Sequence, residues 1–254
     1  MAMPMVKLVE IPLEEKKDEK VVKWLRHYSS AQSILIVGDG DFSFSRALAT
    51  AFGSGENIVA TSLDSYVHLI SMYSKAESNV TELKRLGTTV LHGVDVKNMK
   101  EHTDLKTKRF DRIVFNFPHA GFIGKENQVP MINAHKLLVQ RFFRNASQLR
   151  RPLGEIHVSH KTGQPYDRWG IEELASEFAL AMFQIVPFRK EDYPGYNQKR
   201  GDGDRCDEEF PLCNGCTFKF RVRSLDEEEI ASLLASVAVQ CRVDLSLRRV
   251  EMLN

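Results

Sequence analysis

Cysteine is scarce in this chain and unevenly placed. Only four of the 254 residues are cysteines, and all lie in the last fifth of the sequence. A disulfide framework would spread them more widely, so the pattern favours free thiols in a reducing compartment. A zinc knuckle needs four ligands, and no second Cys-x-x-Cys or His pair follows the one at 213–216, so we expect no metal site. The four are Cys206, Cys213, Cys216 and Cys241.

Long apolar runs and an excess of charge are also missing. No stretch approaches the roughly 20 residues that span a bilayer, and the first ten residues lack the apolar core of a signal peptide. We therefore expect neither a membrane protein nor a secreted one. With 35 basic and 34 acidic residues the formal net charge is +1. This argues against a uniformly basic coat for nucleic acid but leaves room for local basic patches.

The chain does have enough apolar material for a large core. Hydrophobic residues make up 43% of the sequence and charged residues 27%, which fits one α/β domain with short extensions. We expect that domain at residues 31–223. An extension ending in a helix should precede it at 1–30, and a helix and tail should follow at 224–254. Trp24, in an apolar pattern of helical spacing, is expected to pack on the domain.

The most informative segment runs from Ile34 to Ser45 and reads ILIVGDGDFSFS. Four branched apolar residues predict a buried strand, the two glycines allow a tight turn, and Ser43 or Asp41 can cap a following helix. This combination is the nucleotide-binding corner of a Rossmann-like sheet. Dinucleotide enzymes usually have a third glycine where Ser43 stands, and the acidic Asp39 and Asp41 suit a cationic sulfonium better than a pyrophosphate. The segment therefore favours S-adenosylmethionine over NAD.

The wider pattern resembles a specific family. Residues 38–45 are similar to the Gly-Glu-Gly-Asp-Phe-Ser-Phe-Ser opening of Rossmann-like rRNA uracil-N3 methyltransferases of the large (25S-type) ribosomal RNA, with Asp39 in place of the usual Glu. The resemblance continues at 116–121, 160–161 and 196–200, and covers roughly residues 28–223. It implies methyl transfer from S-adenosylmethionine to N3 of a uridine in large-subunit rRNA. It also implies a location in the nucleus or nucleolus, with the cytoplasm as the alternative.

Alternating strand and helix patterns continue along the chain. Repeated β-α units predict a parallel sheet with helices on both faces. One long helix is expected at 66–86 and another at 134–149, and the last strand should be antiparallel. The resemblance implies the class I methyltransferase fold, with seven mostly parallel strands in the order 3-2-1-4-5-7-6. The expected strands are 34–37, 57–64, 88–92, 110–116, 155–160, 182–188 and 217–222.

Ligands of an open α/β sheet bind over the carboxyl ends of its strands, and the candidate cofactor residues lie at such ends. Gly38 and Gly40 would let the backbone approach the cofactor, while the helix beginning near Ser43 would offer free N–H groups to its carboxylate. Asp64 is expected to accept the ribose hydroxyls, with a helix N-cap as its alternative role. Asp95 is expected to accept the adenine amino group, or only to shape a turn.

The segment after the fourth strand contains the catalytic candidates. Asn116-Phe117-Pro118-His119 occupies the position of the Asn/Asp-Pro-Pro-aromatic tetrad of amino-methylating enzymes, which holds the target nitrogen in line with the methyl group. Because the N3 proton of uracil must leave before the nitrogen can attack, a neutral His119 is our candidate base. Asn116 or Phe117 would orient or stack the uracil. The match to the tetrad is partial, so the division of roles stays open.

Basic and aromatic residues near the end of the domain are candidates for RNA binding. Lys161 follows the fifth strand, and Tyr196, Lys199 and Arg200 lie in a long region at 190–215 with little periodicity. Such residues, with Phe117 and Pro118, suit an unstacked base and its phosphates. A solvated loop is the alternative interpretation. If the target base is paired, it must flip out to react.

Two other functions stay open on the sequence alone. A non-catalytic protein could keep the fold and the cofactor pocket and act as an RNA-binding or ribosome-assembly factor. It would bind the cofactor without transferring a methyl group to RNA. A nicotinamide-dependent oxidoreductase predicts glycine where Ser43 stands, and titration with S-adenosylhomocysteine against NADH would separate it. The oligomeric state and the target nucleotide are also left open.

Overall fold

The computed structural model describes residues 21–121 and 124–223, and within them seven strands form one sheet. Their order is β5-β4-β3-β6-β7-β9-β8, which is 3-2-1-4-5-7-6 when the sheet strands are numbered along the chain. The predicted order is confirmed, as is the antiparallel last strand. The strands are β3 (Ile34–Val37), β4 (Ile58–Thr61), β5 (Thr89–Leu91), β6 (Phe110–Asn116), β7 (Arg150–Lys161), β8 (Leu180–Pro187) and β9 (Gly215–Val222).

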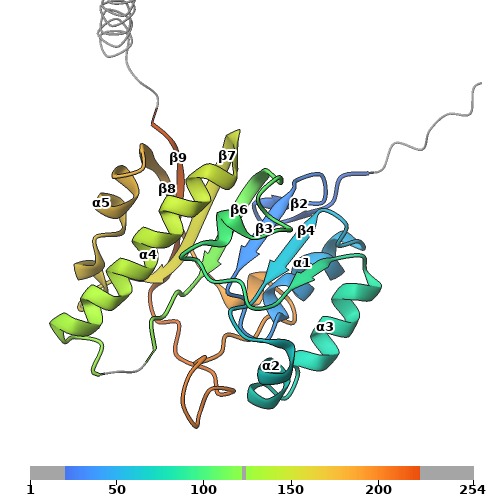
Figure 1. Ribbon diagram of the computed structural model, residues 1–254, viewed down its shortest axis with the longest axis horizontal. Helices are drawn as coiled ribbons and strands as arrows, with labels where there is room; N and C mark the ends of the chain where they lie inside the picture. Colours follow the sequence, from blue (N-terminus) through green and yellow to red (C-terminus); the bar gives the residue numbers. More distant parts are fainter. Residues whose placement is uncertain (1–20, 122–123, 224–254) are drawn as a thin grey trace, which may run out of the picture.

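Helices cover both faces of the sheet, as a parallel α/β sheet requires. Figure 1 shows α4 and α5 in front of β7 to β9, and α1 and α3 beside β4. Short 3-10 turns lie in three of the connections between these elements: η1 (Met99–Glu101), η2 (Tyr166–Trp169) and η3 (Lys190–Asp192). The α-helices are α1 (Ser43–Phe52), α2 (Tyr66–Met72), α3 (Ala76–Arg85), α4 (Val129–Leu149) and α5 (Ile171–Ser176).

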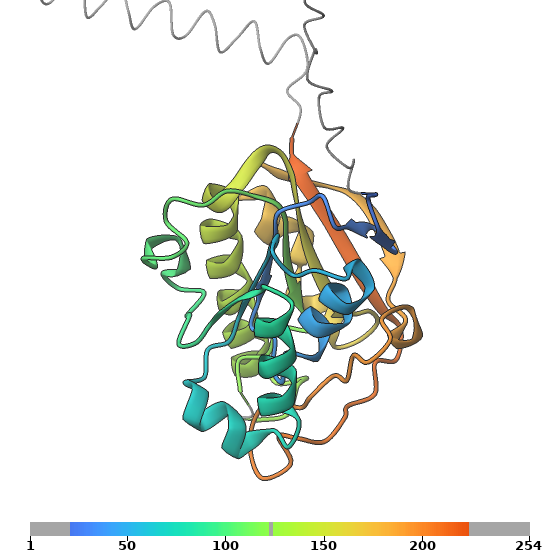
Figure 2. The same cartoon turned by 90° about the vertical axis from the view of Figure 1, so that its right-hand side faces the viewer.

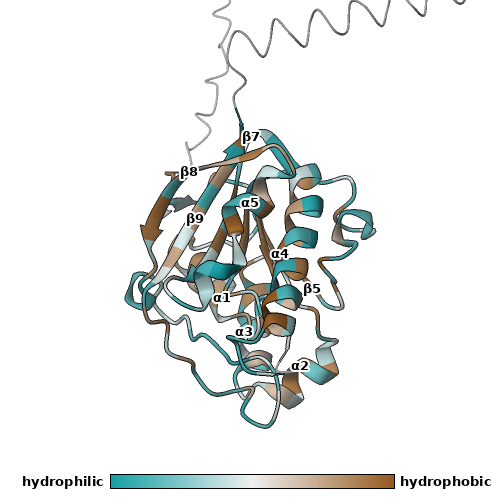
Figure 3. Cartoon of the chain, turned by 90° about the vertical axis from the view of Figure 1, so that its left-hand side faces the viewer, coloured by the Kyte–Doolittle hydropathy of each residue, from teal (hydrophilic) through white to brown (hydrophobic). Residues whose placement is uncertain are grey.

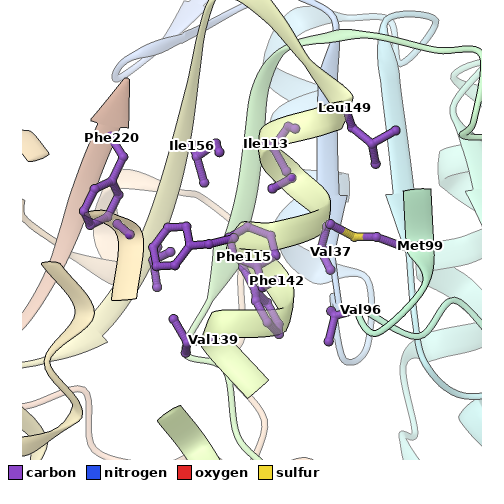
Figure 4. Close-up of a cluster of buried hydrophobic side chains, with 14 of the residues drawn as sticks. Val37, Val96, Met99, Ile113, Phe115, Val139, Phe142, Leu149, Ile156 and Phe220 are labelled. Carbon is purple, nitrogen blue, oxygen red and sulfur yellow. The ribbon is translucent and has the colours of Figure 1, made fainter. Parts of the chain in front are cut away.

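One core lies between the sheet and α4. Phe142 and Leu149 of α4 pack against Ile113 and Phe115 of β6 and Val37 of β3, all of them buried (Figure 4). Because α4 repeats its apolar residues every three or four positions, one side of the helix meets the sheet and the other meets solvent. Figure 3, which looks onto this face, shows the outer side of α4 mostly hydrophilic.

A second core lies on the opposite face and explains why β3 is apolar throughout. Ile34 and Ile36 point into it, whereas Leu35 and Val37 point towards α4. Successive side chains of a strand alternate between its faces, so a central strand covered on both faces needs a continuous apolar run. The ILIV sequence therefore specifies the middle of the sheet.

The prediction of a helix near Trp24 is wrong. Trp24–Leu25 (β1) and Tyr28–Ser29 (β2) form a two-pair antiparallel hairpin instead, with Arg26 in the left-handed region (φ 55) at its turn. Trp24 is 62% exposed, and Tyr28 is the aromatic residue that packs inside. The Tyr28 hydroxyl lies 3.1 Å from Nδ1 of buried His157 on β7, which fixes the hairpin to the sheet.

The single helix expected at 66–86 is split into α2 and α3. Tyr73 adopts an extended conformation (φ −125, ψ 117) and is 2% exposed. The Met72 carbonyl accepts from the Cys206 thiol, and Ser74 donates to Asp207. Burial of the Tyr73 ring and these contacts to a distant loop outweigh local helix propensity.

Other boundaries shift by a few residues. Helix α4 begins at Val129, earlier than expected, with a proline in its first turn, where the missing N–H is not needed. Strand β7 starts at Arg150, directly after α4. The expected C-terminal helix and tail, Cys241 and residues 1–20 lie outside the described residues. In the described ranges, no helix combines the length and hydropathy needed to cross a bilayer.

Candidate cofactor and catalytic site

Two cavities lie side by side at the carboxyl ends of the strands. The first, of about 630 Å³, is lined by the turns after β3, β4 and β6. The second, of about 610 Å³, is lined by the ends of β6 and β7 and by η2. The segment 190–214, orange in Figures 1 and 2, crosses this edge and reaches α2. Residues shared by both cavities are Phe117, Pro118, His119, Lys199, Arg200 and Phe210.

The two glycines of the first turn have different physical roles. Gly38 has a φ of +60, and a Cβ there would lie 2.9 Å from the Phe115 ring, so both conformation and space demand glycine. Gly40 has no left-handed φ, and its nearest neighbour would be the Tyr73 hydroxyl at 3.6 Å. Because Gly40 lines the first cavity, a side chain there would take up ligand space rather than strain the fold.

Helix α1 is capped by aspartate side chains. Asp41 Oδ1 accepts from the Ser43 N–H at 3.0 Å, and Asp39 Oδ2 accepts from the Ser45 N–H at 2.8 Å. The N-cap position itself is Phe42, in the left-handed region. The expectation that this helix offers free N–H groups to the cofactor is therefore wrong, because the chain's own carboxylates occupy them.

Ser43 does not line either cavity. Its hydroxyl accepts from the Asn197 N–H at 2.9 Å and lies 3.2 Å from the Asn197 carbonyl. Ser43 therefore fixes the long 190–214 segment to the start of α1. This replaces the cofactor contact that the sequence suggested and explains why a polar residue suits this position.

Buried carboxylates give the first cavity its electrostatic character. Asp41 is 2% exposed, and its Oδ2 has no hydrogen-bond partner among the described residues. Burial raises the pKa of Asp39 to about 7 and also raises the pKa of Asp41. A buried acceptor without a donor is costly, so a cationic ligand group with N–H donors would be stabilised here.

Asp64 and Asp95 follow β4 and β5 and line the same cavity. Asp64 Oδ1 lies 2.8 Å from His68 Nδ1, and the N-cap of α2 is Ser65, so the capping alternative for Asp64 is wrong. Asp95 accepts from the Lys97 N–H at 2.9 Å, which shapes the turn. Both carboxylates stay within reach of a ligand, and their ribose and adenine contacts remain predictions.

Asn116 ends β6 with a fixed side-chain amide. Its Oδ1 accepts from the Ser159 hydroxyl at 2.7 Å, which leaves Nδ2 buried and without a partner among the described residues. Phe117, the next residue, has a φ of 48, and its N–H donates to the Ser159 carbonyl. Left-handed non-glycine residues are strained and concentrate at functional sites. The Asn116 amide thus presents N–H donors towards the first cavity.

His119 is neutral and has one nitrogen occupied. Burial lowers its pKa, and Nδ1 accepts from the Gly121 N–H at 3.1 Å, so the ring proton is on Nε2. His135, which sequence reasoning missed, accepts from the Ala120 N–H through its own Nδ1. Its ring stacks on Trp169 and lies 4.6 Å from the His119 ring. His135 therefore holds the segment that carries His119.

Two of the expected RNA-binding residues are engaged inside the protein. Tyr196 is 8% exposed and packs edge-on against Phe44, so it serves the core instead of stacking on a base. Lys199 Nζ lies 2.6 Å from Asp207, with its side chain 7% exposed, so it closes the loop instead of binding a phosphate. Arg200 lies on the wall between the two cavities. Burial thus changes the roles expected for Tyr196 and Lys199.

Lys161 ends β7 in the second cavity, where the structure adds two partners. Its Nζ lies 3.2 Å from the Tyr166 hydroxyl, which lies 2.5 Å from Glu126 Oε2. Trp169 and Phe210 also line this cavity. Glu126 lies in a turn before α4 and Tyr166 begins the short η2, so no spacing in the sequence could have identified them.

The first cavity fits S-adenosylmethionine on the chemistry of its donors and acceptors. The orphaned Asp41 oxygen suits a cationic group, while Asp64 and Asp95 can accept from hydroxyl and amino groups. Arg141 on α4 lines the same cavity and could pair with a carboxylate. Gly40 leaves space beside the backbone. A cationic molecule bearing an amino acid and a nucleoside would match each of these features.

The model of the family described as rRNA (uridine-N3-)-methyltransferase BTM5-like matches residues 35–200. Among individual proteins, the 25S rRNA (uridine(2634)-N(3))-methyltransferase of Saccharomyces cerevisiae is 26% identical, with 70% of this chain and 68% of that protein covered.

Two plant relatives are more similar in sequence. Heavy metal-associated isoprenylated plant protein 41 of Arabidopsis thaliana is 50% identical over 240 residues, which cover 94% of this chain and 46% of that protein. The chain thus spans less than half of that relative. The Arabidopsis protein At4g26485 is 47% identical over 201 residues, 78% of this chain and 96% of that protein. Among solved structures, a methyltransferase homologue from Pyrococcus horikoshii has a TM-score of 0.49 at 14% identity, covering 76% of this chain and 62% of that chain.

Replacing Gly40 should separate ligand binding from folding. Gly40→Val should abolish S-adenosylmethionine binding with little loss of stability, because the new side chain projects into the cavity and not into the core. Gly38→Ala is the matched contrast and should lower the melting temperature, because it adds strain and a clash with Phe115. Calorimetric titration and thermal unfolding of both variants test this. Normal cofactor affinity in folded Gly40→Val would contradict it.

Burial of Asp39 predicts a pH-dependent stability. Its pKa of about 7 in the folded protein exceeds the 3.8 of an ordinary Asp, so ionising Asp39 disfavours the folded state. Its contribution to stability should be complete below about pH 4 and lost as the pH rises through about 7. Asp39→Asn should remove this dependence, so the free energy of unfolding of the variant relative to wild type should rise from pH 5 to pH 8. If urea unfolding gives the same difference in free energy between Asp39→Asn and wild type at pH 5 and at pH 8, the prediction is wrong.

Proposed function

The chain belongs to the BMT5-like rRNA (uridine-N3-)-methyltransferase family, and we propose that it methylates N3 of a uridine in large-subunit rRNA. Its cofactor is S-adenosylmethionine, which supplies an electrophilic methyl group when bound. The observation that best supports methyl transfer to a base is the pair of adjoining cavities with the segment 117–119 as a common wall, and the target atom N3 is proposed from the family. One cavity would hold the methyl donor, and the other would hold the base.

The chain's own residues would position the base. Asn116 lines the first cavity next to the shared wall, and its amide is oriented by Ser159. Its Nδ2 would donate to a carbonyl oxygen of a uracil that reaches the junction of the two cavities. Uracil presents two carbonyl oxygens on either side of N3, so one fixed donor defines which edge of the ring faces the first cavity. Positioning of this kind supplies much of the rate in a displacement reaction.

His119 remains our catalytic candidate, and its hydrogen bond from Gly121 separates two roles. If the contact persists, neutral His119 presents Nε2–H and stabilises negative charge on a uracil oxygen as the N3 proton leaves. If the contact opens when RNA binds, Nδ1 can accept the N3 proton itself. The lowered pKa supports either role, because both need the neutral ring at pH 7.

Transfer of a labelled methyl group tests the proposed function directly. The protein is incubated with tritiated S-adenosylmethionine and total RNA from cells that lack the enzyme, and the digested nucleosides are identified by mass spectrometry. N3-methyluridine in large-subunit rRNA supports the proposal, and a nucleolar location would follow from the site of rRNA synthesis. Cofactor binding without transfer to any RNA would instead indicate a non-catalytic RNA-binding factor.

Substitution of His119 should lower turnover without affecting the cofactor. His119→Ala should be slower by roughly 10²–10⁴-fold, the usual contribution of a general acid or base, with near-normal affinity for S-adenosylhomocysteine. The wild-type rate should rise with pH through the His119 pKa, and because burial lowers that pKa the rising limb should lie below pH 6.5. Kinetics from pH 5 to pH 9 measure both effects.

A second variant distinguishes the two roles of His119. His119→Gln keeps an N–H donor but offers no base of useful strength. It should retain much more activity than His119→Ala if the ring donates, and the two should be equally slow if the ring accepts a proton. Wild-type rates in His119→Ala at neutral pH would remove His119 from the mechanism.

A further inference from the structure

We propose that Lys161, held in place by Tyr166 and Glu126, is the cationic group that binds the N3-deprotonated form of uracil in the second cavity. The inference rests on the proposed function. It says which side chains make the base easier to deprotonate and which select uracil. Its starting point is the array in which Lys161 Nζ, the Tyr166 hydroxyl and Glu126 Oε2 follow one another at 3.2 and 2.5 Å.

The direction of the hydrogen bonds is fixed by the number of protons. The Tyr166 hydroxyl has one proton and donates it in the short hydrogen bond to the Glu126 carboxylate. The Tyr166 oxygen must therefore accept from Lys161. Burial and the bond to Glu126 raise the pKa of Tyr166 well above its usual value, so the phenol stays protonated. Lys161 therefore acts as a donor with its further N–H groups available to a ligand.

The surroundings of Lys161 suit a flat aromatic ring. The Nζ lies 5.0 Å from the centre of the Tyr166 ring and 5.1 Å from that of Phe210, and these rings line the second cavity with Trp169 and Phe117. The cavity volume of about 610 Å³ accommodates a nucleotide base drawn out of a helix. Aromatic walls supply stacking, and the ammonium supplies the one strong charge needed for recognition.

Other charged and titratable groups face the second cavity together with Lys161. His119 and His160 are kept neutral at pH 7 because burial lowers their pKa values, that of His160 to about 4. Lys199 is paired with Asp207. Glu126 is separated from Lys161 by the Tyr166 hydroxyl. Two further cations line the same cavity, Arg200 on the facing loop and Lys125 beside Glu126, and Cys213 lies near Tyr166.

The chemistry explains why a cation is useful at this position. Uracil N3 has a proton at neutral pH and cannot act as a nucleophile until the N–H bond breaks. The proton leaves to Nδ1 of His119 if that nitrogen accepts it, or to hydroxide in the solvent if His119 only donates. The electron pair stays on the ring, shared by N3 and the two carbonyl oxygens. An ammonium that donates to one of these oxygens favours the anion and lowers the pH at which it forms.

The same arrangement discriminates against cytosine. Cytosine has an amino group where uracil has its O4 oxygen, and it has no N3 proton to lose. An N–H donor from Lys161 opposite that amino group would leave two donors facing each other, which costs affinity. Selection of uracil would therefore come from one side chain at the end of β7.

Variants of Lys161 test the inference on transcripts of large-subunit rRNA. Lys161→Met keeps the length and apolar contacts of the side chain and should slow methylation at neutral pH by on the order of 10²–10³-fold, the usual cost of removing one oxyanion donor. Its deficit should shrink as the pH rises, because the base then ionises without help. Lys106 is an exposed lysine just before β6, at the end of that strand that lies away from the cavities. Lys106→Met is therefore the matched control and should behave as wild type.

A more acidic substrate gives a second readout that folding defects cannot imitate. Transcripts made with 5-fluorouridine have a more acidic imide, so the deficit of Lys161→Met should be smaller on them at every pH. Tyr166→Phe should have an intermediate effect in the same direction, because it leaves the cation present but unanchored. Binding of S-adenosylhomocysteine should be unchanged in all variants and reports on folding.

The outcomes separate this inference from the proposed function. If wild type methylates no uridine in rRNA, the proposed function fails. If wild type is active and Lys161→Met shows the same deficit at every pH and on both transcripts, the ammonium does not control the acidity of the base and the inference is overturned. Equal rates in Lys161→Met and wild type would overturn it as well.

Discussion

The close packing of Gly38 against Phe115 is the constraint on which the site depends. It brings the end of β3 against the end of β6, with a Cβ at Gly38 excluded at 2.9 Å from the ring. The turn that follows places Asp39 and Asp41 under the start of α1, where their carboxylates cap the helix. Two buried acidic groups therefore lie at the first cavity as a consequence of the backbone path. Their need for a positive partner and the preference for a cationic cofactor have the same origin.

The second feature that organises the site is the long segment between β8 and β9. It is held at Ser43 by the Asn197 backbone and across the loop by the Lys199–Asp207 pair. These contacts use residues that a polar loop would otherwise present to solvent or RNA. The segment forms part of both cavities, so a single connection lines the first cavity and also shapes the second.

Neutral and charged groups lie in separate places around the two cavities. Burial keeps His119 and His135 uncharged, with Nδ1 of each accepting from the backbone of the segment between them. The cationic group lies across the second cavity at Lys161, anchored by Tyr166. A base bound between them would face the neutral His119 ring on one side and the Lys161 ammonium on the other. This arrangement suits a reaction in which the base becomes an anion.

The family resemblance implied the order of the strands, whereas the sequence by itself determined the individual strands, the turn at Gly38 and Gly40, and the positions of the acidic residues at strand ends. These follow from local patterns, because buried strands need apolar runs and a tight turn needs glycine. Only the tertiary structure decided that Trp24 is exposed while Tyr28 is buried, that Tyr73 interrupts a helix, and that Tyr196 and Lys199 face inward. It also brought Tyr166 and Glu126 to Lys161. Those outcomes depend on contacts between segments far apart in the chain, and no local spacing specifies which polar side chain finds a buried partner.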